Sequence, residues 1–292
     1  MDAIATIGKR CMTSSTTQLR RLLARPGIVR SLAPHDVFTA KVMEQAGIEL
    51  LFLGGFGASA SLLGLPDVGF ITLPEMADLA RRVTGAVRVP VIVDGDTGHG
   101  GWQNVVRCVR DFEKAGAAGM LLEDQAFPKR CGHFAGKQVI PADEMLVKLR
   151  AALESRDDAN FVIIARTDAR ATEGLDAAID RANRYAEAGA DVIFVEAPQS
   201  VDELAKVAAA IPKPQLANML VGGATPILSA DELGRMGFKI CVSPVESLAI
   251  TGFAVRALAQ AMRDAGRVDG LASQMLSFAE LKDVLGVSEW LQ

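Results

Sequence analysis

A helix-to-strand unit recurs along the chain and constrains the fold more than any other feature of the sequence. Four amphipathic stretches each end at a glycine that is expected to cap the helix, and an apolar run follows each glycine. These glycines are Gly47, Gly116, Gly189 and Gly237. Four further apolar runs bring the total to eight and cover residues 28–32, 89–93, 161–165 and 215–217. The runs are continuous rather than alternating, which is typical of strands buried on both faces of a parallel sheet.

Eight such strands with helices between them predict a parallel (β/α)₈ barrel of the TIM type, with a doubly wound open sheet as the structural alternative. The expected intervening helices include residues 73–82, 142–153, 175–188, 201–210 and 230–236. Residues 253–265 and 278–290 continue as helices beyond what barrel closure needs, and Ser277 is the expected cap of the second. We therefore expect a barrel over residues 1–265 and a C-terminal helical extension over 266–292.

Composition excludes several classes of function. The longest apolar stretch, about residues 50–65, is interrupted by glycines and serines and is not expected to span a membrane. The net charge is -4 without a long basic run, which argues against nucleic acid as a partner. The four cysteines are widely spaced, and the N-terminus shows no hydrophobic signal core, so we expect reduced thiols and a cytoplasmic location.

Polar residues gather where the predicted strands end. Active sites of (β/α)₈ barrels lie at the C-terminal ends of the strands, so side chains at these positions are expected to share one mouth. They are Asp94 and Asp96 after the third run, Glu123 after the fourth, Arg166 and Asp168 after the fifth, Glu196 after the sixth and Asn218 after the seventh.

The carboxylates at two neighbouring strand ends predict a metal site. An isolated Asp-Gly-Asp is more often a turn in which the second aspartate, here Asp96, caps the next helix. Glu123 favours the metal, because three carboxylates in one mouth with Asp94 would repel one another without a cation. Carboxylate oxygens suit a hard cation such as Mg²⁺ or Mn²⁺. Asp67, in a Pro-Asp segment that is also typical of turns, is a candidate fourth ligand.

One cysteine lies in a setting that favours reactivity. Cys131 stands in a glycine-containing polar loop beside Lys129 and His133, where positive charge lowers the pKa of a thiol. Such a loop suits a closing lid better than core packing. Cys108 falls in a helical stretch and Cys241 in an apolar strand, so both are expected to pack in the core.

Three further residue patterns each allow two interpretations. A zinc site formed by Cys131, His133 and His99 is less favoured than Mg²⁺, because no second ligand pair of the usual spacing accompanies it. Arg166 could form a structural ion pair with the aspartate two residues on, but in a barrel mouth a clamp for a planar carboxylate is favoured. The glycines of residues 54–57 do not form a nucleotide-binding motif, and their backbone N–H groups are candidates for holding a carboxylate.

These motifs resemble the isocitrate lyase/phosphoenolpyruvate mutase superfamily over about residues 28–265. The motifs that carry the resemblance are residues 64–69, 94–98, 123–125 and 129–133. The last of them, Lys-Arg-Cys-Gly-His, is specific for the carbon–carbon lyase branch of the superfamily, since its phosphonate-forming members carry an asparagine-containing loop there.

The resemblance implies roles for individual residues. Asp94 is expected to contact Mg²⁺ directly, Asp67, Asp96 and Glu123 to hold its waters, and Cys131 to be the catalytic acid. Matching positions that orient the loop, polarise the substrate or bind its carboxylates are Lys129, His133, Arg166, Glu196 and Asn218. Members of the superfamily are usually homotetramers that exchange a C-terminal helix between subunits, and the helices after residue 265 fit that arrangement.

The same resemblance narrows the substrate to a small 2-hydroxy dicarboxylate. Lyases acting on 2-methylisocitrate usually have Ser-Gly-Gly where this chain has Gly54, Gly55 and Phe56, and an arginine where it has Ala249. Both changes remove polar contacts that a tricarboxylate needs. The expected reaction is C2–C3 cleavage of an alkylmalate such as 2,3-dimethylmalate to pyruvate and a carboxylic acid. The alternatives are 2-methylisocitrate cleavage, oxaloacetate decarboxylation, and phosphonate formation or hydrolysis.

Overall fold

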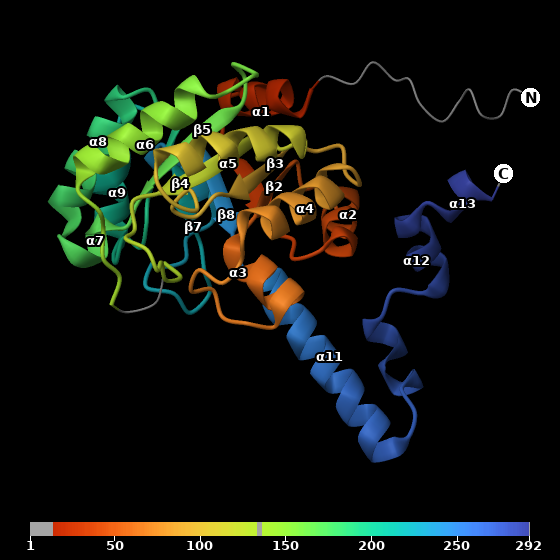
Figure 1. Cartoon of the computed structure of the whole chain (residues 1–292). Helices are drawn as coiled ribbons and strands as arrows, with labels where there is room; N and C mark the ends of the chain where they lie inside the picture. Colours follow the sequence, from red (N-terminus) through yellow and green to blue (C-terminus); the bar gives the residue numbers. More distant parts are fainter. Residues whose placement is uncertain (1–13, 133–135, 292) are drawn as a thin grey trace, which may run out of the picture.

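The computed structural model describes residues 14–132 and 136–291, and eight parallel strands form a barrel at its centre (Figure 1). The strands are β1 (Val29–Leu32), β2 (Leu50–Leu53), β3 (Val91–Asp94), β4 (Gly119–Glu123), β5 (Val162–Thr167), β6 (Val192–Val195), β7 (Leu216–Asn218) and β8 (Ile240–Ser243). Each strand pairs with the next along the chain, β8 pairs with β1, and a parallel bridge between Ile193 and Gln215 joins β6 to β7. The predicted (β/α)₈ barrel is confirmed, and the open-sheet alternative is wrong.

Helices surround the strands and follow most of them in sequence. Those before β4 are α1 (Ser15–Ala24), α2 (Val37–Gln45), α3 (Gly55–Ala58), the π-helix η2 (Ser59–Leu63), α4 (Leu73–Thr84) and α5 (Trp102–Lys114). Those from β4 to β8 are α6 (Ala142–Glu154), α7 (Ala169–Thr172), α8 (Leu175–Glu187), α9 (Val201–Ala210) and α10 (Ala230–Met236). The chain ends with α11 (Glu246–Ala265), the 3₁₀ helix η3 (Asp269–Gln274), α12 (Phe278–Leu285) and α13 (Val287–Trp290).

The repeated glycines lie just after helices, as the sequence pattern predicts. Gly47, Gly116, Gly189 and Gly237 follow α2, α5, α8 and α10, with φ angles of 88°, 83°, 109° and 111°. A residue with a Cβ is strained in this left-handed region, whereas glycine adopts it freely and lets the chain turn from the helix into the next strand.

The continuous apolar runs fill two hydrophobic clusters. Within β5, Val162 and Ile164 point into the barrel interior, and Ile163 and Ala165 pack against the surrounding helices. Because both faces of each strand are covered, alternation between polar and apolar residues is lost. The burial of both faces explains why the strands were recognisable in the sequence.

Helix α1 lies across the N-terminal ends of the strands. Leu19 on this helix is fully buried and belongs to the cluster inside the barrel. Polar contacts fix the helix there, since Thr16 Oγ1 donates to Asp158 at 2.6 Å and Arg20 pairs with Asp191 at 2.7 Å. The helix therefore closes the end of the barrel opposite the predicted site.

We expect Leu19→Ala to lower the free energy of unfolding by about 2–5 kcal/mol, because it removes a fully buried side chain and leaves a cavity. Urea denaturation at one protein concentration measures the change. Leu22→Ala is the matched control, since Leu22 only packs against the edge of the same cluster and should cost less. Equal losses at both positions would contradict the view that Leu19 plugs the barrel.

The C-terminal helices differ from the predicted boundaries. Helix α11 begins at Glu246 rather than at residue 253, because a single glycine such as Gly252 weakens a helix interior without ending it. The predicted helix over 278–290 is divided in two by Gly286, whose φ is 68°. The cap at Ser277 is confirmed, since its side chain accepts a hydrogen bond from the N–H of Glu280.

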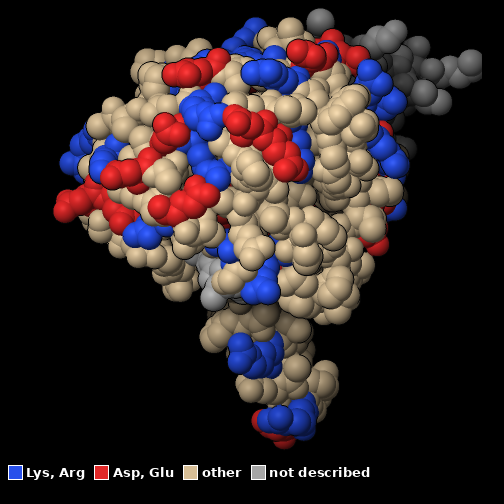
Figure 2. Space-filling view, turned by 60° about the vertical axis from the view of Figure 1, so that its left-hand side comes forward, with Lys and Arg blue, Asp and Glu red and all other residues tan. Residues whose placement is uncertain are grey.

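Helix α11 leaves the barrel and projects from it as an arm, and the chain then returns toward α2 through η3 and α12 (Figure 1). No residue of α11 is buried. Acidic and basic side chains are interspersed over the barrel on the face that Figure 2 shows, whereas much of the arm is uncharged there. None of the helices in the described part of the chain is long and apolar enough to cross a membrane.

Candidate active site

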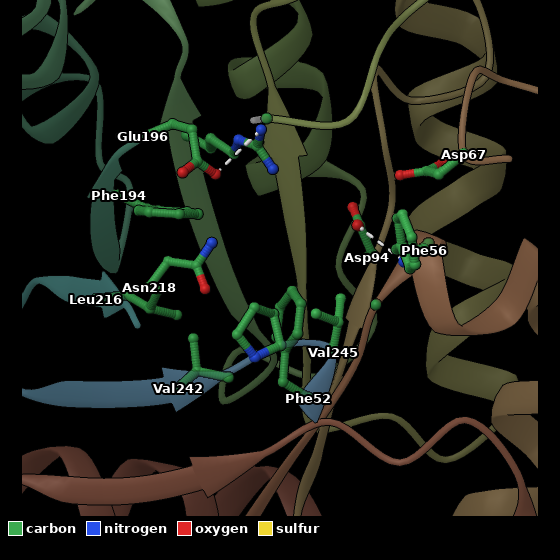
Figure 3. A pocket seen from close by; sticks show the side chains of 15 residues that line it. Phe52, Phe56, Asp67, Asp94, Phe194, Glu196, Leu216, Asn218, Val242 and Val245 are labelled. Atoms are coloured by element: carbon green, nitrogen blue, oxygen red, sulfur yellow. Dashed lines mark hydrogen bonds and ion pairs between the residues drawn. The ribbon is translucent and has the colours of Figure 1, made fainter. Parts of the chain in front are cut away.

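A cavity opens at the C-terminal ends of the strands and encloses about 490 Å³ of space including its open mouth. Asp67 and Asp94 lie on one side of it and Phe194, Glu196 and Asn218 on the other, with Phe52, Val242 and Val245 between them (Figure 3). The lining is completed by Gly54, Gly55, Phe56, Gly132, Arg166, Leu216 and Pro244. Most of the predicted substrate-contacting residues therefore share one cavity.

Backbone N–H groups hold the carboxylate of Asp94. Its Oδ2 accepts from the N–H of Gly55 at 3.1 Å, and its Oδ1 accepts from the N–H of Asp96 at 3.0 Å. Asp96 itself has a φ of 47° and lies in a turn, because α5 begins only at Trp102. The alternative that Asp96 caps the next helix is therefore wrong.

Lys129 lies among the predicted metal ligands. Its Nζ is 2.5 Å from Asp67 Oδ1 and 2.7 Å from Asp96 Oδ1, and all three side chains are buried. Burial alone would lower the pKa of Lys129, but the carboxylates of Asp96, Asp67, Glu123 and Asp94 together raise it well above its usual value. The lysine thus supplies a positive charge to this cluster.

Burial hinders two acids of the cluster from ionising. Burial, only partly opposed by Lys129, raises the pKa of Asp96 to about 7, and burial also raises the pKa of Glu123 well above its ordinary value. Glu123 Oε1 is buried and accepts no hydrogen bond from the described residues. Oxygen donors and an unsatisfied buried acceptor fit a hard cation. In residues 14–132 and 136–291 no three Cys, His, Asp or Glu side chains lie close enough together to hold a metal ion. Lys129 lies between the carboxylates of Asp67 and Asp96.

Arg166 connects three carboxylates at the ends of β4, β5 and β6. Its guanidinium donates to Asp168 at 2.8 and 3.1 Å and lies 3.1 Å from Glu196 and 3.4 Å from Glu123. Burial alone would lower the pKa of Arg166. The three neighbouring acids outweigh this effect and raise the pKa well above its usual value, so the side chain stays charged. The ion pair with Asp168, which the sequence left as an alternative, is present, and a contact between Arg166 and substrate stays a prediction.

The loop that carries Cys131 lies against this cluster. The N–H of Cys131 donates to the carbonyl of Asp67 at 3.1 Å, and the thiol-bearing residue is half-buried. Cys108 is fully buried and Cys241 packs partly against the core, as predicted, and burial raises the pKa of both thiols. Cys131 and Cys241 are both partly exposed, but of the three described cysteines only Cys131 lies in a loop beside the carboxylate cluster.

The zinc alternative stays a prediction. His133, which it requires, lies outside the described residues, as does Cys11. Burial lowers the pKa of the His99 imidazole, which therefore stays neutral. The roles predicted for His133 beside Cys131 remain predictions.

Gly132 leaves no room for a side chain. A Cβ at this position would lie 2.5 Å from Arg166 Nη2 and 2.6 Å from Glu196 Oε2. We expect Gly132→Ala to push the loop away and to lower kcat/KM by about 10- to 100-fold, corresponding to the 1–3 kcal/mol typical of overpacking. Steady-state kinetics measures the loss. Gly136→Ala would instead meet the flexible end of Arg130 and strain a backbone whose φ is 77°, so it disturbs the loop without a clash in the site, and a loss of the same size there would argue for a general loop effect.

Comparison with known proteins identifies the family. A family model described as phosphoenolpyruvate phosphomutase matches residues 19–266. The chain belongs to the phosphoenolpyruvate mutase/isocitrate lyase superfamily. This confirms the resemblance that the Cys131 loop and the carboxylate motifs predict.

Relatives within the superfamily include carbon–carbon lyases. The 2,3-dimethylmalate lyase of Eubacterium barkeri is 41% identical over 276 residues, which cover 94% of this chain and 96% of the relative. The petal death protein of Dianthus caryophyllus is 41% identical, covering 96% and 88%. A chloroplastic carboxyvinyl-carboxyphosphonate phosphorylmutase of Arabidopsis thaliana is also 41% identical, covering 94% and 83%. Further relatives are named 2-methylisocitrate lyase, so the predicted lyase assignment is supported.

Solved structures of the superfamily match the whole barrel. An oxaloacetate acetylhydrolase in complex with 3,3-difluorooxalacetate gives a TM-score of 0.90 at 34% identity and covers 95% of each chain. The crystal structure of a 2,3-dimethylmalate lyase also gives a TM-score of 0.90 at 34% identity, covering 96% of this chain and 94% of that one.

Two buried residues near this superfamily site were not singled out from the sequence. Asp124, next to Glu123, points away from the cavity and accepts hydrogen bonds from Thr167 at 2.7 Å and Tyr185 at 2.9 Å. Alternation along a strand end could have indicated this direction. Lys137 pairs with Asp168 at 2.6 Å, and no spacing rule in the sequence indicates that contact.

Proposed function

We propose that this protein is a Mg²⁺-dependent lyase which cleaves the C2–C3 bond of a 2-hydroxy dicarboxylate to an α-keto acid and a carboxylic acid. The observation that carries the proposal is the half-buried Cys131 on a loop seated over a mouth of four carboxylates and Arg166. The names of the lyase relatives support the same reaction class.

The predicted metal ligands would be Asp94, Asp96, Glu123 and Asp67. Their chemistry fits a hard cation, and a related phosphonopyruvate hydrolase structure is described as a complex with oxalate and Mg²⁺. A bound Mg²⁺ would stabilise negative charge on the substrate oxygens. Mn²⁺ is expected to substitute for it.

Protein side chains would carry the remaining steps. The substrate hydroxyl at C2 would pass its proton to a carboxylate of the mouth, the carbonyl of the keto acid would form, and the C2–C3 electron pair would pass into the enediolate of the departing acid. The Cys131 thiol then donates its proton to that carbon. Lys129 and Arg166 keep positive charge beside the developing anions, Glu196 orients Arg166, and Asn218 faces the substrate across the cavity.

An alkylmalate fits the cavity better than a tricarboxylate does. Among the described lining residues Arg166 is the only cationic one, and it already pairs with three carboxylates. Phe56, Pro244 and Val245 give the lining an apolar part, and Ala249 on α11 adds no charge. A third substrate carboxylate buried without a partner would be costly. We therefore propose cleavage of 2,3-dimethylmalate to pyruvate and propionate.

A pyruvate assay coupled to lactate dehydrogenase tests this choice directly. Substituted malates and 2-methylisocitrate are compared by kcat/KM under the same conditions. The highest value is expected with 2,3-dimethylmalate. If 2-methylisocitrate gave the highest value, the substrate proposal would be wrong while the lyase proposal stood.

Two other activities have specific observations in their favour. The match to an oxaloacetate acetylhydrolase makes oxaloacetate a candidate substrate, which is tested by its direct loss and by analysis of the products. The phosphorylmutase relative makes a phosphonate a candidate, and a Cys131→Ala protein that is fully active on a phosphonate would support it. Both rank below the alkylmalate, because neither needs a thiol on the loop.

We also propose a homotetramer in the cytoplasm. Ile250, Phe253 and Met262 on α11 are 64%, 63% and 53% exposed, and apolar surface on a projecting helix is typical of an interface. Exchange of this helix between subunits would cover it. Light scattering that showed only monomer would contradict the assembly.

A further inference from the structure

The backbone beside Cys131 is held at three consecutive residues by three different partners. The side chain of Gln125 binds both the N–H and the carbonyl of Arg130, at 3.0 and 2.9 Å. The carbonyl of Asp67 accepts from the N–H of Cys131. The carbonyl of Gly132 accepts from Lys137 Nζ at 2.5 Å. The thiol is therefore carried on a fixed stretch of backbone, although it lies in a loop.

Lys137 contributes the contact on the cavity side. Its ammonium is buried and bridges the Gly132 carbonyl to Asp168 Oδ1, which lies 2.6 Å away. Gly132 lines the cavity, and a Cβ there would clash with Arg166 and Glu196. Lys137 thus holds Gly132, the residue after Cys131, next to Arg166.

Asp168, the carboxylate that binds Lys137, is itself held by several contacts. Asp168 is fully buried, and Arg166 binds it through two nitrogens. The N–H of Asp168 donates to Asp124 at 2.9 Å, and Asp124 is also held by Tyr185 of α8 at 2.9 Å. Burial would raise the pKa of Asp168, but Arg166 and Lys137 lower it, so it stays ionised as their partner. The loop is tied through Lys137 to a side chain that the barrel itself fixes.

We propose that Lys137 is a positioning residue, which holds the Gly132 carbonyl against the Arg166 cluster and thereby keeps Cys131 in place for proton transfer. This assignment rests on the proposed lyase function for its effect on turnover. The position of the thiol can be measured without turnover, so the two ideas are separable.

Lys137→Met is the main test. The variant removes both contacts of the ammonium while Arg166 still pairs with Asp168, so the barrel should fold. We expect kcat on the best malate to fall by about 10²-fold, the size associated with a small misplacement of a reacting group, while KM changes little. We also expect the peptide containing Cys131 to be alkylated faster by iodoacetamide in the absence of substrate, as measured by mass spectrometry.

Matched variants separate positioning from a general loss of structure. Lys137→Arg keeps the charge and should recover part of kcat and of the slow alkylation. Lys239→Met is the control, because Lys239 also binds two backbone carbonyls, those of Arg25 and Gly27, but at the opposite end of the barrel. It should leave kcat and Cys131 alkylation unchanged. Lys137→Gln is measured alongside, so that the comparison survives if the methionine variant does not fold.

The outcomes distinguish the two proposals. Unchanged Cys131 alkylation in folded Lys137→Met or Lys137→Gln protein would overturn the positioning role, whatever the activity. Faster alkylation in these variants of a protein that cleaves no malate would support the positioning role and count against the lyase. Faster alkylation together with a fall in kcat supports both.

Discussion

EDTA will abolish turnover, and Mg²⁺ or Mn²⁺ will restore it. Asp94, Asp96, Glu123 and Asp67 bring four carboxyl groups to one side of the mouth, and Lys129 is the only described cation that contacts two of them. The raised pKa values of Asp96 and Glu123 follow from burial, and a divalent cation would offset that cost for the ionised forms. Activity is measured after chelation and after each metal is added back in excess.

A binding measurement makes the metal test independent of activity. A ligand that binds only the folded state raises its apparent stability, so Mg²⁺ should raise the melting temperature of the unmodified protein. Asp94→Asn should lose most of this rise, because it weakens the predicted direct ligand while keeping a side chain of the same shape. If Asp67 and Asp96 held the waters of the cation, as predicted, the ammonium of Lys129, which contacts both carboxylates, would have to move aside. Turnover that survives chelation, or that returns only with Zn²⁺, would contradict the assignment.

The barrel was predictable because its signals are local. Each of the four glycines with positive φ stands directly between a helix and a strand, so one residue marks the junction. The runs in strands such as β5 are continuous because both faces are buried. Strand ends then place Asp94, Glu123 and Glu196 at one mouth without any knowledge of side-chain contacts.

The electrostatic details were not predictable, because they depend on residues far apart in the sequence. Lys129 pairs with Asp67 across 62 positions, and Lys137 with Asp168 across 31. A lysine beside a cysteine was interpreted as lowering the pKa of the thiol, but its ammonium turns instead into the carboxylate cluster. Helix α11 shows a different limit, since whether Gly252 ends a helix is decided by the surrounding structure.

Cys131→Ala will lower kcat by about 10²–10⁴-fold, the usual contribution of a positioned general acid. The substitution removes the proton donor but leaves its backbone contacts, since the N–H that binds the Asp67 carbonyl is unchanged. The cavity is lined by Gly132 rather than by the cysteine itself, so substrate binding should be largely retained. Steady-state kinetics gives kcat, and calorimetric titration of the substrate into the variant gives the affinity.

Cys108→Ala and Cys241→Ala are the matched controls, because they remove the same group from positions that face the core. Burial raises the pKa of both thiols, so neither is ready to donate and regain a proton near neutral pH. Cys108→Ala should cost stability through a small cavity, and both variants should keep their turnover. A comparable loss of turnover at all three cysteines would show that the alanine at position 131 acts through the fold. A loss confined to Cys131 assigns the proton to the one thiol that stands on the loop over the carboxylates.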